Sequence, residues 1–254
     1  ILAVPEYIPD FTGKNSKKET GYVGLKNQGA TCYMNSMLQA LFHLPAFRRI
    51  VYNMETSTTE DPEKCIPLCL QKLFCQLQFR DVACSTKTLT KSFGWTDMDS
   101  IMQHDVQEFC RVLIDNLEMK MKGTELENSI PKLFKGRTRS YIRCINVNYE
   151  SSKIEEFYDL SMLVKGCKNL QESFEKYIEK EKMDGDNQYN TEEFGKQDAE
   201  MGVEFIEFPS VLHLHLRRFE YDYETGMMIK INDRFEFPEE IDLSKFLAKN
   251  VKNF

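Results

Sequence analysis

The hydrophobic residues of this chain change their spacing near its midpoint, and this change limits the folds available to it. In three segments of the first half they recur every three or four residues, as on one face of an amphipathic helix: residues 31–41, 67–77 and 103–121. Three segments of the second half either alternate apolar and polar residues or are rich in β-forming side chains: residues 139–147, 157–164 and 203–219. Helices followed by strands predict an α+β fold.

Breaks in these patterns predict where the elements end. Pro45 is expected to end the first helix, and residues 54–64 are expected to form a polar, acidic loop. One helix is expected in the second half, at residues 170–180. The segment IKINDRFEFPEEIDL indicates a strand, a turn and a second strand that Pro238 limits. Residues 1–20, with prolines and then the polar run GKNSKKET, are predicted to be an N-terminal linker.

Composition and charge exclude several classes of protein. With 254 residues, 41% of them hydrophobic and 29% charged, the chain can form a sizeable core and is typical of globular proteins. Its net charge of −7 disfavours a general nucleic-acid binder, which would carry a basic patch. The apolar runs are too short to cross a bilayer, and residues 1–10 lack the pattern of a secretory signal. We therefore expect no nucleic-acid partner and no membrane association.

The cysteines indicate a reducing compartment. The chain has eight of them, and no two form a CxxC pair. Their spacing does not match the disulfide framework of a small secreted domain, and a chain of this length needs no such crosslinks inside a cell. The sequence therefore predicts reduced thiols in a protein of the nucleus and cytoplasm.

Cys32 stands out because it lies where a polar loop meets a helical pattern, in GLKNQGATCYMNSMLQAL. Gly29 allows a tight turn, and Thr31 is expected to cap the helix, which would place Cys32 in the first turn. The helix dipole and unpaired N–H groups favour a thiolate there. The loop can also bring the side-chain N–H₂ of Asn27 near the sulfur, where it could stabilise the oxyanion of an acyl-transfer intermediate. On spacing alone, a small buried residue at a helix start is the alternative.

This segment resembles the cysteine box of the ubiquitin-specific proteases, a family of deubiquitinating cysteine peptidases with a papain-like core. Three later segments resemble further motifs of the family, in the same order: TKSFGWTDMDSIMQHDVQEFCRVL, FPSVLHLHLRRFEYD and KINDRFEFPEEIDL. The resemblance covers residues 22–246 without a break. It implies one catalytic domain over residues 21–254, with a helical thumb at 21–125 and β fingers with part of a β palm at 126–254.

The resemblance also implies roles for individual residues. Cys32 would attack the isopeptide or peptide bond after the C-terminal glycine of ubiquitin, and Asn27 would donate to the oxyanion. Asp105 and Glu108 would share one helix face and bind the arginines of the ubiquitin tail, although a solvated helix face is the alternative. Trp95 would lie in a loop that gates the site, or would be a core anchor. Further substrate contacts are implied for Gln107, His215 and Phe219. The implied partners are ubiquitin and ubiquitinated proteins, and no cofactor is expected.

Two departures from the family pattern bear on function. The family places its general base in a Gly-His-Tyr motif, and the sequence to Phe254 contains none. We therefore expect a catalytic domain truncated before its His box, with an incomplete palm. Many members also hold zinc with two CxxC pairs, but here Val147 stands where a cysteine would follow Cys144. A tetrahedral site needs four ligands, so we expect no metal.

Three functions are consistent with these observations. The first is a thiol-dependent ubiquitinyl hydrolase. The second is a catalytically inactive ubiquitin-binding module or scaffold, because the expected base is absent from the sequence. The third is a papain-like protease that uses His213 or His215 as its base, since these alternate residues of a strand point to the same face.

Overall fold

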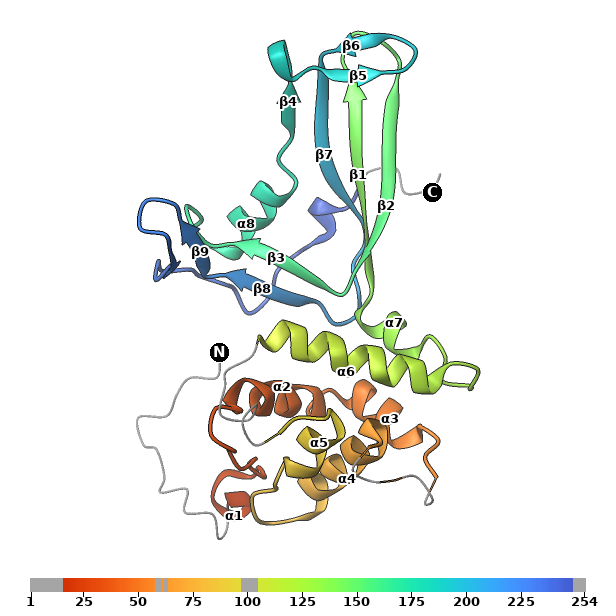
Figure 1. Cartoon of the computed structure of the whole chain (residues 1–254), viewed down its shortest axis with the longest axis vertical. Coiled ribbons are helices and arrows are strands. Elements are labelled where there is room, and N and C mark those ends of the chain that lie inside the picture. Colours follow the sequence, from red (N-terminus) through yellow and green to blue (C-terminus); the bar gives the residue numbers. More distant parts are fainter. Residues whose placement is uncertain (1–15, 58–60, 62–63, 97–104, 249–254) are drawn as a thin grey trace. The chain divides into compact units, whose positions relative to one another are not determined.

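The computed structural model describes residues 16–57, 61, 64–96 and 105–248 (Figure 1). The chain divides into two compact units, Ile1–Ile130 and Pro131–Phe254. All named strands belong to the second unit, whereas the named elements within the first are helices. The described residues therefore confirm the predicted α+β class. Among them, no helix combines the length and the hydropathy that crossing a membrane requires.

The described residues of the first unit form six α-helices, and a further helix, α7 (Ser129–Phe134), spans the division between the units. The six are α1 (Ser16–Thr20), α2 (Cys32–Phe42), α3 (Pro45–Asn53), α4 (Ile66–Phe79), α5 (Lys87–Ser92) and α6 (Val106–Met121). Their apolar sides pack together, and the ring of Phe74 contacts those of Phe42 and Phe47 at centroid distances of 5.4 and 6.2 Å. Fully buried side chains of α2, α4 and α6 include Met34, Leu38, Leu41, Leu70, Leu113 and Leu117.

The helical part of the chain differs from the prediction in three places. The first helix ends at Phe42, and Pro45 begins α3 because proline fits the first position of a helix. Helix α5 was not predicted, since its sequence KTLTKS has one large apolar residue, Leu89. Residues 16–20 of the predicted linker form α1. The backbone N–H of Lys17 in this helix donates to the carbonyl of Asp81 at 3.4 Å.

In the second unit, residues up to 248 are described and form ten strands and helix α8 (Leu170–Tyr177). The strands are β1 (Gly136–Cys144), β2 (Glu150–Phe157), β3 (Asp159–Leu163), β4 (Glu181–Met183), β5 (Tyr189–Thr191), β6 (Gly195–Gln197), β7 (Ala199–Glu207), β8 (His213–Arg217), β9 (Phe219–Asp222) and β10 (Met227–Lys230). One antiparallel sheet has the order β2–β1–β7–β4. The pairs β9–β10 and β5–β6 are hairpins, and β3 pairs with β8 in parallel.

Aromatic side chains form the core of the second unit. The ring of Phe174 on α8 lies 6.0 Å from that of Phe205 on β7 and stacks on that of Phe246 at 5.0 Å. Leu160 and Met162 of β3 belong to the same buried cluster. The partly buried Leu214 and Leu216 of β8 pack against this cluster, so β8 faces the core with its leucines and turns its histidines away from it.

The strands also depart from the prediction. The region 203–219 is divided among three strands, and Pro209, which has no N–H to donate, lies between β7 and β8. The second strand predicted after residue 230 does not form. Ile231 and Phe235 instead enter the buried core cluster, and Glu236 makes an isolated parallel bridge with Asn169. Burial of these two side chains holds the segment together with backbone hydrogen bonds between Glu236 and residues 168 and 170, at 2.9 Å each.

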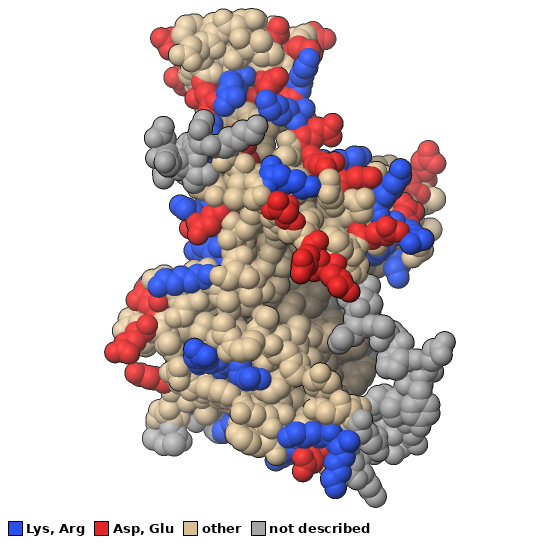
Figure 2. Space-filling model, turned by 180° about the vertical axis from the view of Figure 1, so that it is seen from behind, with Lys and Arg blue, Asp and Glu red and all other residues tan. Residues whose placement is uncertain are grey.

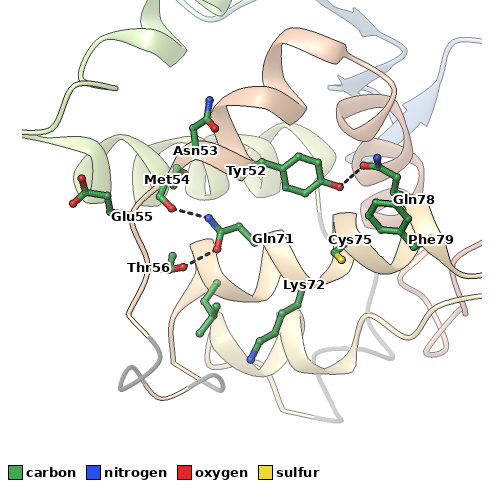
Figure 3. A pocket seen from close by; sticks show the side chains of 11 residues that line it. Tyr52, Asn53, Met54, Glu55, Thr56, Gln71, Lys72, Cys75, Gln78 and Phe79 are labelled. Carbon is green, nitrogen blue, oxygen red and sulfur yellow. Dashed lines mark hydrogen bonds between the residues drawn. The ribbon is translucent and has the colours of Figure 1, made fainter.

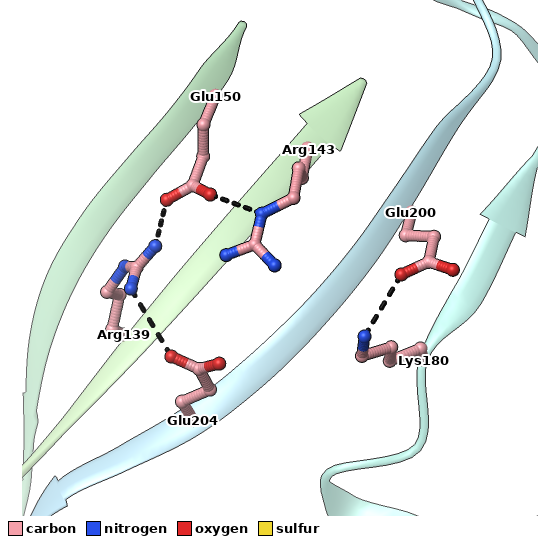
Figure 4. A network of polar contacts seen from close by, with 6 residues as sticks. All are labelled: Arg139, Arg143, Glu150, Lys180, Glu200 and Glu204. Atoms are coloured by element: carbon pink, nitrogen blue, oxygen red, sulfur yellow. Dashed lines mark hydrogen bonds and ion pairs between the residues drawn. The ribbon is translucent and has the colours of Figure 1, made fainter. Parts of the chain in front are cut away.

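Ion pairs line one face of the main sheet (Figure 4). The buried guanidinium of Arg139 on β1 donates to Glu150 and to Glu204, the latter at 3.3 Å. Arg143 donates to Glu150 at 2.6 Å, which makes Glu150 a bridge between two arginines. On the face shown in Figure 2, charged side chains of both signs cover the second unit densely, whereas the first unit shows few.

Candidate active site

Cys32 is the first residue of α2 and is exposed, as a nucleophilic thiol must be. Thr31 occupies the predicted cap position, but its hydroxyl makes no capping hydrogen bond to α2. Thr31 is fully buried, and its side chain points back into the preceding loop. The predicted placement of Cys32 at the helix start is thus confirmed, whereas the predicted capping by the Thr31 hydroxyl is wrong.

The carboxamide of Asn27 is held by the loop that precedes α2. Its Oδ1 accepts hydrogen bonds from the hydroxyl of Thr31 at 2.9 Å and from the N–H of Thr31 at 3.2 Å. Its Nδ2 donates to the carbonyl of Gly29 at 2.9 Å. Gly29 has a φ of 119°, which favours glycine. One hydrogen of Nδ2 is therefore used within the loop, and the other is the one available to a substrate oxygen.

The pKa of Tyr33 on α2 is affected by residues of both α2 and α6. Burial raises the pKa of the Tyr33 phenol above its usual value, and electrostatic interaction with Cys32 and with Glu108 raises this pKa further. Its ring also contacts that of Phe109 at a centroid distance of 6.3 Å. Sequence reasoning did not single out Tyr33, because a tyrosine one residue after the cysteine carries no motif by itself.

Asp105 and Glu108 lie at the N-terminal end of α6, and Asp105 immediately precedes the first helical residue. It is the N-cap residue, and its carboxylate accepts the backbone N–H of Gln107 at 2.7 Å. Glu108 lies in the first turn, and both residues are exposed. The prediction that both lie on one helical face needs this correction, because the helix begins at Val106. The spacing D-x-x-E was itself a capping signal.

Trp95 is partly buried and follows α5. Its ring lies 5.8 Å from that of Phe93 and 6.0 Å from that of Phe109. The backbone N–H of Trp95 donates to the carbonyl of Thr90 at 3.2 Å. Trp95 also lines a cavity of about 430 Å³ with Lys91. The indole thus packs on aromatic neighbours and keeps an accessible side. The rest of the predicted gating loop, residues 97–100, lies outside the described residues, and so do residues 101–104, among them His104.

The predicted contacts His215 and Phe219 belong to the second unit. His215 lies on β8 opposite Ser161 and is partly buried, while Phe219 begins β9 and is 60% exposed. His213 lies opposite Asp159, and its ring contacts that of Phe134 in a tilted arrangement at a centroid distance of 5.0 Å. Burial lowers the pKa of His213, an effect that Asp159 opposes. Each unit thus carries its own part of the predicted site.

One cavity among the described residues does not involve the predicted site residues. A cavity of about 780 Å³ between the end of α3 and α4 is lined by none of the predicted site residues (Figure 3). In its wall, Gln71 donates to the carbonyls of Val51 and Met54 at 2.9 and 2.8 Å. Where the structure describes the chain, no group of three or more His, Cys, Asp or Glu could hold a metal ion.

Comparison with known proteins shows which family the sequence matches. A family model described as ubiquitin carboxyl-terminal hydrolase matches residues 23–253. The chain is 57% identical to Ubiquitin C-terminal hydrolase 12 of Arabidopsis thaliana, over 94% of this chain and 21% of that protein. It is 55% identical to Ubiquitin carboxyl-terminal hydrolase 7 of Drosophila melanogaster, over 93% of this chain and 21% of that protein. The chain thus spans about a fifth of the length of these relatives.

A solved structure matches the fold. It is the SAGA Ubp8/Sgf11/Sus1/Sgf73 DUB module bound to ubiquitin aldehyde, with a TM-score of 0.77 and 26% sequence identity. The match covers 93% of this chain and 55% of that chain.

Proposed function

Because this chain belongs to the ubiquitin carboxyl-terminal hydrolase family, that of the ubiquitin-specific proteases, we propose that it acts as a thiol-dependent deubiquitinase. In this proposal Cys32 cleaves the isopeptide or peptide bond after the C-terminal glycine of ubiquitin. The observation that carries the proposal is an exposed thiol at the first position of α2, inside a family match over residues 23–253.

The chemistry proceeds in two steps. The Cys32 thiolate attacks the carbonyl carbon, and the carbonyl oxygen becomes an oxyanion that the remaining N–H of Asn27 stabilises. Collapse of this intermediate breaks the C–N bond, the departing amine takes up the proton that the thiol has lost, and ubiquitin stays bound to the sulfur as an acyl-enzyme. Water then hydrolyses the thioester and restores the thiol. The start of a helix suits this cysteine because N–H groups there stabilise negative charge.

We further propose that acidic side chains at the start of α6 bind the basic tail of ubiquitin. Asp105 and Glu108 are exposed, and charge-assisted pairs with arginine fit this task. The solved structure to which the chain is similar contains ubiquitin aldehyde, which supports ubiquitin as the partner. The exposed Phe219 and the partly buried Trp95, Gln107 and His215 are proposed as further contacts.

The test is a ubiquitin whose C-terminus carries an electrophile, added to the full-length protein. We expect a covalent adduct that disappears in Cys32→Ala. Cys75 is the matched control, because it is the other exposed thiol among the eight free cysteines. Cys75→Ala should therefore leave the adduct unchanged. Binding of the probe without an adduct would instead support the inactive ubiquitin-binding module. An adduct that persists in Cys32→Ala would remove Cys32 as the nucleophile.

Turnover of a ubiquitin substrate tests the alternative in which His213 or His215 is the general base. If His213 or His215 were the base, replacing it by alanine would abolish turnover. We expect turnover in both variants, since His213 is packed against Phe134 and its pKa is lowered by burial. The nucleus and cytoplasm remain the proposed location, because the cysteines are free thiols.

A further inference from the structure

We propose that Thr31 is a positioning residue that, together with Gln28, fixes the Asn27 carboxamide so that its free N–H faces the carbonyl under attack. This inference rests on the proposed function and names residues that the family motif does not explain. It arises from a chain of hydrogen bonds that runs from α5 to Asn27 without passing through Cys32.

The first link sets which way the amide points. Thr31 presents two donors, its hydroxyl and its N–H, to the Oδ1 of Asn27 at 2.9 and 3.2 Å. Two donors can be satisfied only by an oxygen, so a flipped amide would place N–H₂ against them. Thr31 is fully buried, and water cannot replace the lost partners. The oxygen of Asn27 is therefore held on the Thr31 side, and its Nδ2 lies on the other.

The second link sets the direction of the Thr31 hydroxyl. The N–H of Gln28 donates to Oγ1 of Thr31 at 3.1 Å. A hydroxyl that accepts from this side directs its single proton elsewhere, and the available acceptor is Asn27. This explains why the hydroxyl of Thr31, the N-cap residue, makes no capping hydrogen bond to α2. Its hydroxyl is used to orient the neighbouring amide.

The third link ties the loop to α5. Nε2 of Gln28 donates to the hydroxyl of Thr86 at 2.6 Å. The hydroxyl of Thr90 approaches Oε1 of Gln28 at 3.4 Å, and also donates to the carbonyl of Lys87 at 3.0 Å. Thr86 and Thr90 are buried, and Thr90 accepts the N–H of Trp95 through its carbonyl. The amide of Asn27 is therefore supported by α5 and the residues leading to Trp95.

The test compares Thr31→Val with Thr31→Ser in the full-length protein, using a fluorogenic ubiquitin substrate. Valine keeps the shape of threonine but has no hydroxyl, whereas serine keeps the hydroxyl. Removing an oxyanion donor lowers kcat by about 10²- to 10³-fold, so we expect Thr31→Val to lower kcat by about 10- to 100-fold. KM should change by less than about two-fold, because ground-state binding is not affected. Thr31→Ser should restore most of the lost rate.

A double mutant decides whether Thr31 acts through Asn27. Once Asn27→Ala has removed the amide, adding Thr31→Val should lower kcat by less than about three-fold. A further loss as large as in the wild-type background would overturn the inference. The reaction of Cys32 with iodoacetamide forms no oxyanion, so its rate should be unchanged in Thr31→Val. A parallel fall in this rate would indicate general damage and would also overturn the inference.

A separate readout keeps this inference distinct from the proposed function. In an NMR spectrum that resolves the side-chain amide of Asn27, Thr31→Val should shift and broaden its signals, while Thr31→Ser should preserve them. If the protein hydrolyses no ubiquitin substrate, the proposed function fails and this spectrum alone tests the positioning. If Thr31→Val does not fold, Thr86→Val, which removes the partner of Gln28, should produce the same broadening. Unchanged Asn27 signals would overturn the inference.

Discussion

At the residue scale, Asp105 has two roles, and an alanine substitution removes both at once. Its carboxylate caps α6, and its charge is proposed to bind the ubiquitin tail. Asp105→Ala removes both, whereas Asp105→Ser keeps an oxygen that can accept the N–H of Gln107. Both variants should raise KM for a ubiquitin substrate, but only Asp105→Ala should lower the free energy of unfolding, by about 1 kcal/mol. Steady-state kinetics and urea unfolding measure the two effects.

Glu108→Gln completes this comparison, because Glu108 is not the cap. It should raise KM without a change in stability, and alkylation of Cys32 by a small reagent should proceed at the wild-type rate. An equal loss of alkylation and hydrolysis would contradict the tail-binding role.

His213 makes the stability of the second unit depend on pH. Its pKa is lowered from the usual 6.5, mainly by burial, and Asp159 opposes this shift. As the pH falls below 6.5, the unfolded chain binds a proton that the folded chain does not, so the free energy of unfolding decreases. The contribution of His213 to stability is therefore fully present above this pH and decreases below it. The slope from this group cannot exceed about 1.4 kcal/mol per pH unit.

The variant His213→Phe keeps a ring that can pack against Phe134 but cannot titrate. Urea unfolding between about pH 5 and pH 7.5 should show a smaller decrease towards low pH in this variant than in the wild type. Identical slopes in both proteins would show that His213 does not contribute.

The sequence predicts some residues of the candidate site better than others, for physical reasons. Cys32 could be placed at a helix start because the apolar spacing begins there, and a glycine precedes it. The direction of the Thr31 hydroxyl could not be predicted, because it depends on Gln28 and on burial in the folded unit. Asp105 is an intermediate case, since the spacing D-x-x-E before an apolar run predicts a cap.

At the scale of elements, long helices were predictable and short polar ones were not. The helix over 67–77 is described as α4, Ile66–Phe79, because its buried side repeats regularly. Helix α5 has too few apolar residues to produce a pattern, and tertiary contacts through Thr86 and Thr90 support it. The strand predicted after residue 230 did not form, although its sequence has the alternating pattern of a strand. Phe235 is buried in the core cluster but Phe237 is 44% exposed, and in the described part of the chain this segment makes an isolated bridge to Asn169 through Glu236.

Strand β1 allows a direct comparison of a buried and an exposed ion pair. Arg139 is buried and donates to Glu150 and Glu204, whose side chains are 30% and 32% exposed. Arg139→Met leaves these carboxylates without that guanidinium and should lower the free energy of unfolding by about 3 kcal/mol. The measurement is urea unfolding followed by circular dichroism.

Arg137→Met is the matched control on the same strand. Arg137 pairs with Glu207 at 2.8 Å, but the two side chains are 44% and 57% exposed. Water screens such a pair, so the loss should stay below about 1 kcal/mol. Equal losses in the two variants would mean that burial does not determine the contribution of these arginines.

At the scale of the whole molecule, the proposed chemistry is distributed over two units. The thiol, Asn27 and the carboxylates of α6 belong to Ile1–Ile130, whereas His215 and Phe219 belong to Pro131–Phe254. Each unit has buried residues of its own, among them Leu70 in the first and Phe205 in the second. The geometry of the thiol can therefore be maintained by the helical unit, while substrate contacts on the strands depend on a separate core.

Separate cores predict separable unfolding, and the single tryptophan makes this measurable. Trp95 lies in the first unit, so its fluorescence reports on the helices, while hydrogen exchange of β7 peptides reports on the strands. Leu70 and Phe205 are both fully buried, and replacing either by alanine should remove about 2–5 kcal/mol of stability. Leu70→Ala should lower the urea midpoint of the fluorescence transition. Phe205→Ala should leave that midpoint unchanged and accelerate exchange in β7. If Phe205→Ala lowered the fluorescence midpoint as much as Leu70→Ala, the two units would unfold as one, and Cys32 would depend on the strand core for its position.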